Sequence, residues 1–246
     1  MSERRVLPVL PPSDERVSSL AADGTRRFVV PADVTGRFTR WRRAIFALLV
    51  GLWIALPLVH VGGHPAMFLD VAARKFYILG ATFNAQDVWL SFFVITGLAF
   101  GLAFVTALLG RVWCGYACPQ TVFLDGLFRP IERLVEGPRE ARLRRDRGPR
   151  TAARVARKVL KHLLFILAAA GVAHVAVAFF VSVPALWDMM RRSPSEHPEA
   201  FAWAFGVTAV LYGNFAWFRE QFCLIVCPYG RLQSILFDED TLIIGY

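Results

Sequence analysis

The chain has 246 residues, of which 56% are hydrophobic, and its formal net charge is +9 at pH 7. Its mean hydropathy of +0.46 is too high for an ordinary soluble domain and indicates a protein embedded in a lipid bilayer. We expect no nucleic-acid partner, because no recognisable binding motif accompanies the positive charge. In membrane proteins an excess of Lys and Arg gathers on the cytoplasmic side instead.

The first part of the chain differs from the rest. Residues 1–36 are rich in Pro, Ser, Asp and Arg and lack periodic apolar residues, so we predict a disordered cytoplasmic tail. Residues 37–246 are expected to form one transmembrane module, because they contain four long stretches without charged residues. Spanning segments must satisfy their backbone internally, which favours helices. The predicted spans are about 44–60, 88–110, 162–184 and 200–218.

The distribution of basic residues predicts the orientation of these spans. Nine Lys and Arg residues lie in 1–43 and thirteen in 111–161, against two in each remaining segment between or after the spans. The positive-inside rule therefore predicts that the N-terminus and the basic loop 111–161 are cytoplasmic. Four spans return the C-terminus to the same side. The predicted fold is all-α, a polytopic membrane protein whose four transmembrane helices form two helical hairpins.

The four cysteines form two pairs with the same spacing, in "RVWCGYACPQ" and "REQFCLIVCPYG". Cys114 and Cys118 follow the second predicted span, and Cys223 and Cys227 follow the fourth, so each hairpin is expected to end in a Cys-x-x-x-Cys-Pro motif at the cytoplasmic face. Stable disulfides are disfavoured on that reducing side. Both pairs are therefore expected to be free thiols at similar depth.

The spacing suits a shared metal or cluster. Cysteines four residues apart lie on one face of a helix. The proline disfavours helical geometry at the second cysteine and is well suited to begin a new helix. Four thiolates suit zinc, an iron–sulfur cluster or Cu(I), and Cys-Pro also ends the iron–sulfur motif of bacterial ferredoxins. The spacing alone leaves these three occupants open.

Three histidines are candidate metal ligands of secondary rank after the cysteines. His174 lies inside the third predicted span, where ionisable groups are functional candidates. A neutral histidine that is hydrogen-bonded between helices is, however, commoner than a metal ligand. His60 and His64 flank "VGG" after the first span, and two interfacial histidines in a turn are ordinary.

Several segments carry a resemblance to a known family. "DVTGRFTRWRRA", "DVAARKFYILG", "GRVWCGYACPQTVF" and "NFAWFREQFCLIVCPYGRLQSILFDEDTLIIGY" closely resemble the CcoG family, also called FixG or RdxA, the cytochrome c oxidase accessory proteins of proteobacteria. The resemblance covers most of residues 30–246. It implies a bacterial inner-membrane redox protein of the polyferredoxin kind, with a 4Fe-4S cluster. It further implies reduction of Cu(II) to Cu(I), in support of copper delivery to and assembly of a haem–copper cytochrome oxidase. Carried over to this chain, the residues that handle electrons or metal are Cys114, Cys118, Cys223 and Cys227.

The resemblance concerns the N-terminal transmembrane module of the family. Its members continue after the segment matching "TLIIGY" into a ferredoxin domain with two C-x-x-C-x-x-C-x-x-x-C-P motifs, which these 246 residues do not include. A truncated gene product, a fragment and one half of a split protein are three open interpretations. Oxidoreductase activity is expected of the full-length family and stays open for this chain, whose electron donor would be a ferredoxin-type domain or another partner.

Two alternative functions compete with the cupric reductase. The first is a non-enzymatic assembly factor, in which the cysteines bind Cu(I) or zinc structurally while the helices dock a ferredoxin or an oxidase subunit. The second is a quinol-linked electron-transfer subunit, because paired C-x-x-x-C-P motifs beside membrane spans also resemble those of NapH-type and NosR-type iron–sulfur proteins. Quinone would then be a cofactor.

Overall fold

The computed structural model describes residues 31, 33–149 and 151–236. The predicted disordered tail 1–36 therefore lies almost entirely outside the described residues. The chain divides into two compact units, Met1–Asp33 and Val34–Tyr246. All the helices and strands among the described residues belong to the second unit.

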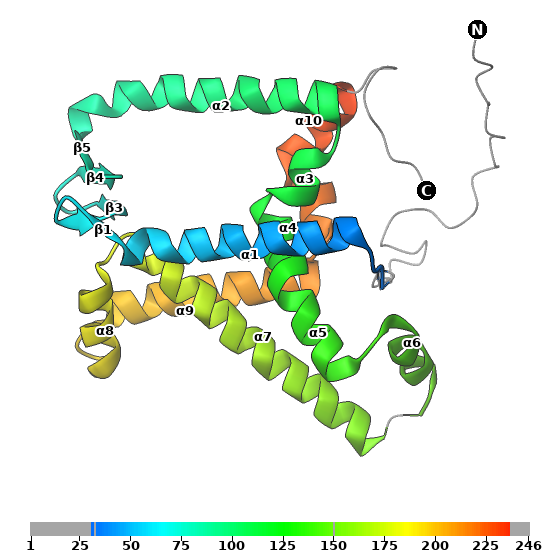
Figure 1. Ribbon diagram of the computed structural model, residues 1–246. Coiled ribbons are helices and arrows are strands. Elements are labelled where there is room, and N and C mark those ends of the chain that lie inside the picture. The colour runs from blue at the N-terminus through cyan, green and yellow to red at the C-terminus, as the bar shows by residue number, and fades with distance from the viewer. Residues whose placement is uncertain (1–30, 32, 150, 237–246) are drawn as a thin grey trace, which may run out of the picture. The chain divides into compact units, whose positions relative to one another are not determined.

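Four long helices dominate the second unit (Figure 1). They are α1 (Arg37–Leu58), α2 (Val88–Leu109), α7 (Ala152–Ala178) and α9 (Pro198–Tyr212). The single-turn 3₁₀ helix η1 (Ala85–Asp87) leads into α2, and the π-helical segment η3 (Gly213–Phe218) extends α9. With these extensions all four are long and apolar enough to cross a membrane, so the prediction of four spans is confirmed at the level of length and composition.

The third helix differs most from its predicted bounds. It begins at Ala152, ten residues before the expected start at 162, because the basic stretch before the apolar run is also helical. It ends at Ala178 rather than near Pro184. Pro184 instead lies in the first turn of a separate helix, α8 (Val183–Arg191), a position that suits its fixed φ and missing N–H.

The all-α expectation is wrong for residues 60–84, although the fold is mostly helical. This segment forms a two-stranded and a three-stranded antiparallel sheet, with Val61 opposite His64 and Met67 opposite Ile78. Positive φ angles at Gly62, Gly63 and Gly80 provide the tight turns between the strands. The strands are β1 (His60–Val61), β2 (His64–Pro65), β3 (Met67–Asp70), β4 (Lys75–Ile78) and β5 (Ala81–Asn84).

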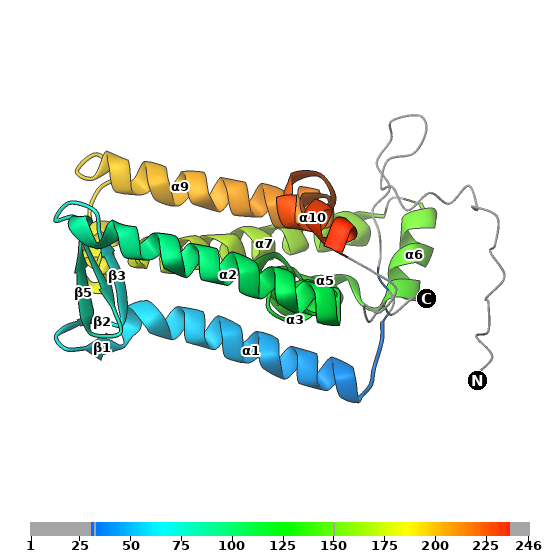
Figure 2. The same cartoon turned by 90° about the horizontal axis from the view of Figure 1, so that it is seen from above.

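The expected basic loop 111–161 is itself largely helical. Its elements are α3 (Val112–Tyr116), α4 (Pro119–Phe123), the π-helical η2 (Leu124–Phe128), α5 (Arg129–Glu136) and α6 (Arg139–Arg147). After α9 and η3 come the π-helical η4 (Phe222–Val226) and α10 (Pro228–Leu236). Figures 1 and 2 show that α3, α4, α5 and α10 gather at one end of the long helices, whereas α8 and the strands lie at the other.

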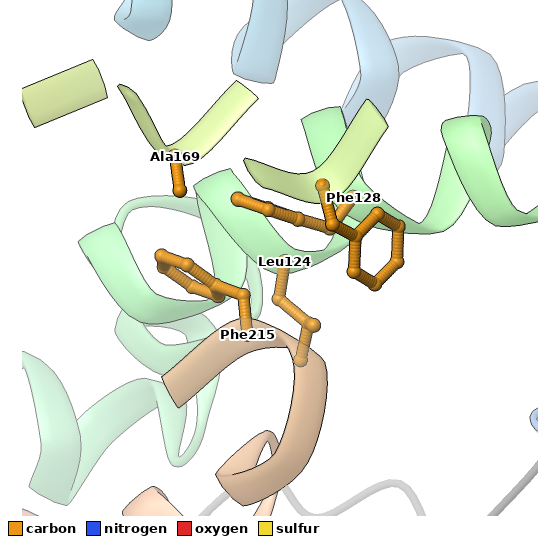
Figure 3. Close-up of a cluster of buried hydrophobic side chains, with 5 residues drawn as sticks. Leu124, Phe128, Ala169 and Phe215 are labelled. Atoms are coloured by element: carbon orange, nitrogen blue, oxygen red, sulfur yellow. The ribbon is translucent and has the colours of Figure 1, made fainter. Parts of the chain in front are cut away.

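The helices pack unevenly. α7 and α9 lie against each other, whereas α1 packs most against α4 and also touches α3, η2, α7, β2 and β3. The apolar side chains of α2 are mostly exposed, among them Phe92, Phe93, Leu98 and Phe104. The apolar core, shown in Figure 3, lies where η2, α7 and η3 meet and consists of Leu124, Phe128, Phe165, Ala169 and Phe215.

Aromatic rings organise this core. Phe128 stacks on Phe215 with ring centroids 4.5 Å apart and meets Phe165 edge-on at 5.2 Å. Such pairs add to the stabilisation that burial itself provides. The core therefore joins the segment that follows the first cysteine pair to the helix that leads into the second.

Candidate functional site

The first Cys-x-x-x-Cys-Pro motif lies in a break between helices. α2 ends at Leu109, and Gly110 follows with φ 58° and ψ −121°, a conformation open to glycine. Cys114 lies in α3, whereas Cys118 is extended, with φ −62° and ψ 125°. Pro119 then begins α4. The predicted helix break at Cys-Pro is confirmed here, and the proline begins the next helix as expected.

The second motif repeats this local structure. η3 ends at Phe218, and Arg219 follows with φ 49° and ψ −120°. Cys223 lies in η4, and Cys227 is extended, with φ −71° and ψ 111°. Pro228 begins α10. The helix break is therefore confirmed at both motifs.

The backbone hydrogen bonds of the two motifs also match. The Cys118 N–H donates to the Trp113 carbonyl at 3.0 Å, and the Cys227 N–H donates to the Phe222 carbonyl at 2.9 Å. Each bond spans five residues and closes the turn that carries the first cysteine. The two motifs thus share their helix break and the hydrogen bond that closes it, although Cys114 lies in an α-helix and Cys223 in a π-helical segment.

The residue after each Cys-Pro reaches to the helix that precedes the other motif. The Gln120 amide exchanges two hydrogen bonds with Asn214, at 2.7 and 3.3 Å, and donates to the Arg219 carbonyl at 3.1 Å. The Tyr229 hydroxyl lies 2.5 Å from the buried Thr106 hydroxyl, which itself donates to the Leu102 carbonyl. The motifs are therefore interlocked reciprocally.

A third cross-link completes the interlock. The buried Gln233 side chain donates to the Gly110 carbonyl at 3.4 Å, in the same way that Gln120 donates to the carbonyl of Arg219. Both carbonyls belong to the positive-φ residue that ends the long helix. Because buried carbonyls that lack a partner are costly, these amides stabilise both breaks.

All four thiols are free and partly buried. Burial, followed by the neighbouring Cys118, Cys114 and Cys227, raises the pKa of Cys223 to about 11. Burial also raises the pKa of Cys114, with contributions from Cys118 and Cys227 and an opposing one from Arg111. The hydrogen bonds between the two halves of the chain, together with these mutual effects, indicate that the two pairs lie near each other.

The donor set fits an iron–sulfur cluster. Among the residues that the structure describes, no three His, Cys, Asp or Glu side chains are arranged to hold a single metal ion. Four cysteine thiolates, Cys114, Cys118, Cys223 and Cys227, are the donor set that would hold a 4Fe-4S cluster. The Cys114 Sγ lies 3.9 Å from the Oε1 of Gln233, a residue of α10, the helix that follows the second motif. Because the raised pKa keeps the Cys114 and Cys223 thiols protonated at pH 7, their binding to a cluster would release protons.

A buried ion pair fixes the start of the second motif. The Arg219 guanidinium contacts both Glu132 oxygens, at 2.9 and 3.4 Å, and the two residues are only 5% and 2% exposed. Arg142 and Lys161 approach Glu132 at 2.8 and 3.7 Å. Burial alone would raise the pKa of Glu132, but Arg219, Arg142 and Lys161 outweigh it and hold the pKa below its ordinary value. The pair anchors Arg219 to α5.

A second group of ion pairs joins α1 to both motifs. The Arg42 side chain donates to the Gly115 carbonyl at 2.8 Å and to the Asp125 carboxylate at 2.6 Å. Arg129 contacts both Asp125 and Glu220. Glu220 lies next to Arg219, so charged residues connect α1, the first motif and the second.

The structure does not bring the three candidate histidines to the cysteines. His60 and His64 lie in β1 and β2, at the far end of α2, a helix about 33 Å long. His60 donates to the Leu58 carbonyl at 3.0 Å, and His64 stacks on Tyr77 at 4.0 Å. His174 donates to the Ala170 carbonyl of its own helix at 2.7 Å, so its Nδ1 is satisfied locally.

Sequence reasoning missed the residues that hold the motifs together. Gln120 and Tyr229 could have been found, because each is a polar residue directly after a Cys-Pro step. Glu132 carries no such signal, since it is one of several charged residues in the basic segment. Its partner Arg219 could equally have paired with its neighbour Glu220.

Comparisons with known proteins agree with the motifs. The family model described as "4Fe-4S binding domain" matches residues 90–138, which contain the first cysteine pair. The family model described as "4Fe-4S dicluster domain" matches residues 218–246, which contain the second. Both pairs therefore lie in segments typical of iron–sulfur proteins. No solved structure matches the chain significantly.

Three curated proteins are similar over nearly the whole chain. Nitrogen fixation protein FixG of Rhizobium meliloti is 33% identical over 90% of this chain and 43% of its own length. Proteins RdxA and RdxB of Cereibacter sphaeroides are each 32% identical, over 89% and 95% of this chain and 47% and 49% of their own lengths. The chain thus spans slightly less than half the length of these relatives. The apolar helices and the iron–sulfur family models together support a membrane iron–sulfur redox protein. The resemblance of this chain to the CcoG/FixG/RdxA family, predicted from its motifs, is therefore confirmed.

Proposed function

We propose that Cys114, Cys118, Cys223 and Cys227 together hold one 4Fe-4S cluster and that this chain carries electrons at the cytoplasmic face of a bacterial inner membrane. The observation that carries the proposal is the set of hydrogen bonds that hold the two Cys-x-x-x-Cys-Pro motifs together, each motif with two free, partly buried thiols. When bound, such a cluster takes up and releases one electron at a time.

The surrounding residues suit this role. Gln120, Gln233 and Tyr229 hold the two motifs in fixed positions through hydrogen bonds between the halves of the chain. Partial burial limits the access of water to the thiols. Arg219, tied to Glu132, holds the backbone that leads into Cys223. Rigid support of this kind keeps ligand geometry constant between oxidation states.

Charge and topology support the membrane arrangement that we propose. α1 with α2, and α7 with α9, would form two hairpins, each ending in a Cys-x-x-x-Cys-Pro motif on the cytoplasmic side. The basic residues of 111–161 and the arginines at the start of α1 lie at the same end as both motifs, in line with the positive-inside rule (Figures 1 and 2). Residues 37–246 act in this proposal as a single transmembrane module.

Copper is the proposed electron acceptor. The proposal rests on the resemblance to the CcoG family, in which one electron per ion converts Cu(II) to Cu(I) for a haem–copper cytochrome oxidase. The chain spans less than half of its relatives, so the electron donor is proposed to be a ferredoxin-type domain or partner outside these 246 residues.

The decisive measurement is the iron and acid-labile sulfide content of the anaerobically purified chain. We expect both in matching amounts, and their loss in each single Cys→Ser variant of either pair. His60→Ala with His64→Ala is the matched control and should keep both. Loss confined to one pair would contradict a shared cluster. Copper or zinc without sulfide would favour the non-enzymatic assembly factor.

A further inference from the structure

An open hollow lies where α5, α6 and α7 meet, away from the cysteine motifs. Its volume is about 830 Å³, within the range of sites for small molecules. Its lining divides into two kinds of side chain. Apolar Leu134, Leu160 and Leu164 come from α5 and α7, and basic Arg144, Arg145 and Arg157 come from α6 and α7.

The arginines give the hollow a surplus of positive charge. Within the described part of the chain, no carboxylate forms an ion pair with Arg144 or Arg157. The Arg145 Nε donates to the Ala141 carbonyl at 3.0 Å. Glu136 also lines the hollow, but its carboxylate pairs with Lys161 at 2.8 Å. The nearby negative charge is thus already offset.

Ion pairs fix the helix that supplies two of these arginines. Arg142 of α6 contacts Glu132 at 2.8 Å, which ties the helix to α5. At the other end of α6, Arg154 of α7 contacts Asp146 at 3.0 Å and donates to the Gly148 carbonyl at 2.8 Å. Because α6 is held at both ends, Arg144 and Arg145 are presented to the hollow in a fixed orientation.

The hollow lies beside the part of α7 where the sequence changes from basic to apolar residues. The first turns of α7 are basic, from Arg154 to Lys161, and the apolar run of the membrane span follows. Leu134 is 83% exposed beside this transition. An exposed leucine next to unpaired arginines, at the end of a spanning helix, matches the boundary between headgroups and acyl chains.

We propose that this hollow binds an anionic phospholipid. Its phosphate would lie among Arg144, Arg145 and Arg157, and the upper part of an acyl chain would follow Leu134, Leu160 and Leu164. Guanidinium groups bind phosphate oxygens in a bidentate manner. A zwitterionic lipid gains less, because its own ammonium group competes with the arginines. Free phosphate has no apolar part that could contact the leucines.

Binding can be measured on the full chain purified in detergent. Phosphatidylglycerol and phosphatidylcholine with identical acyl chains are titrated separately, and native mass spectrometry counts the retained lipids. We expect phosphatidylglycerol to bind more tightly. Arg144→Gln with Arg157→Gln should weaken its binding roughly 30-fold, because each basic group near an anionic headgroup contributes about fivefold. Arg144→Lys with Arg157→Lys should retain the preference.

Arg40→Gln with Arg147→Gln is the matched control. Both residues are exposed and neither lines the hollow, so the control loses the same charge and should bind like the wild type. Circular dichroism of all variants reports whether they fold. Equal affinity for the two lipids, an equal loss in the control, or displacement of phosphatidylglycerol by an equal concentration of glycerol phosphate would each overturn the proposal.

Discussion

Gly110 and Arg219 adopt nearly the same backbone conformation at equivalent positions, with φ 58° and ψ −121° in one and φ 49° and ψ −120° in the other. Each lies four residues before the first cysteine of its motif. Glycine reaches this region without steric cost, whereas a residue with a side chain loses about 1–3 kcal/mol there. Arg219 tolerates the strain because Glu132 binds its guanidinium.

Removal of the Arg219 charge should destabilise the protein strongly. Arg219→Gln leaves the buried Glu132 with only Arg142 and Lys161, and breaking a buried pair costs about 3–5 kcal/mol. We expect a loss of about 3 kcal/mol in the free energy of unfolding, measured by denaturant titration in detergent. Arg192→Gln, which breaks an exposed pair with Asp188, is the control and should cost under about 1 kcal/mol. Equal losses would show that the buried Arg219–Glu132 pair stabilises the protein no more than an exposed ion pair does.

Gly230 should be intolerant of a side chain. A Cβ there would lie 2.6 Å from the Cys223 carbonyl oxygen. This is a backbone atom, so no side-chain rotation can relieve the clash. Gly230→Ala should therefore displace the second motif and reduce bound iron, measured per mole of purified protein. Gly115→Ala is the matched control next to the first motif, because nothing lies within 4 Å of its Cβ. Full iron content in Gly230→Ala would contradict the close packing of α10 on η4.

Gln120 and Asn214 should be energetically coupled. Their amides exchange two hydrogen bonds across the two halves of the chain. In a double-mutant cycle with Gln120→Ala and Asn214→Ala, we expect a coupling of about 1–2 kcal/mol in the free energy of unfolding. Gln120→Ala paired with the distant Thr208→Ala should give additive losses. Additivity in the first cycle as well would mean that the motifs are held together by other contacts.

Stability should fall in acid because of Glu132. Its pKa lies below the ordinary value of 4.5 in the folded protein, so the carboxylate form is the one that the fold favours. The resulting stabilisation is complete above pH 4.5 and is lost as the pH falls through the lower folded-state value. Thermal unfolding of the wild type and Glu132→Gln should therefore differ most at neutral pH and converge in acid. Asp188→Asn, at an exposed position, should show no such convergence.

The sequence predicted the features that depend on composition and on proline. Long uncharged stretches identified the four apolar helices, because only such stretches can cross a bilayer. The Cys-Pro steps predicted both helix breaks at Cys118 and Cys227, since proline restricts the residue before it. These are local constraints, which a sequence states directly.

The rest depends on contacts between distant residues. The strands of 60–84 were missed because each is only two to four residues long, too short for an alternating apolar pattern to identify it. Glu132 and Arg219 are far apart in the chain, so nothing local links them. The convergence of the motifs was expected from membrane depth, but the amide bonds that hold them together arise only from the packed fold.

The interlock between the motifs has a consequence for biogenesis. Gln120 is synthesised long before Asn214 and Arg219, so its amide has no partner while the ribosome is still translating α7 and α9. The turn that carries Cys114 and Cys118 therefore gains this support only after α9 and η3 have been synthesised. The two cysteine pairs can be held together in this way only once both halves of the chain are present.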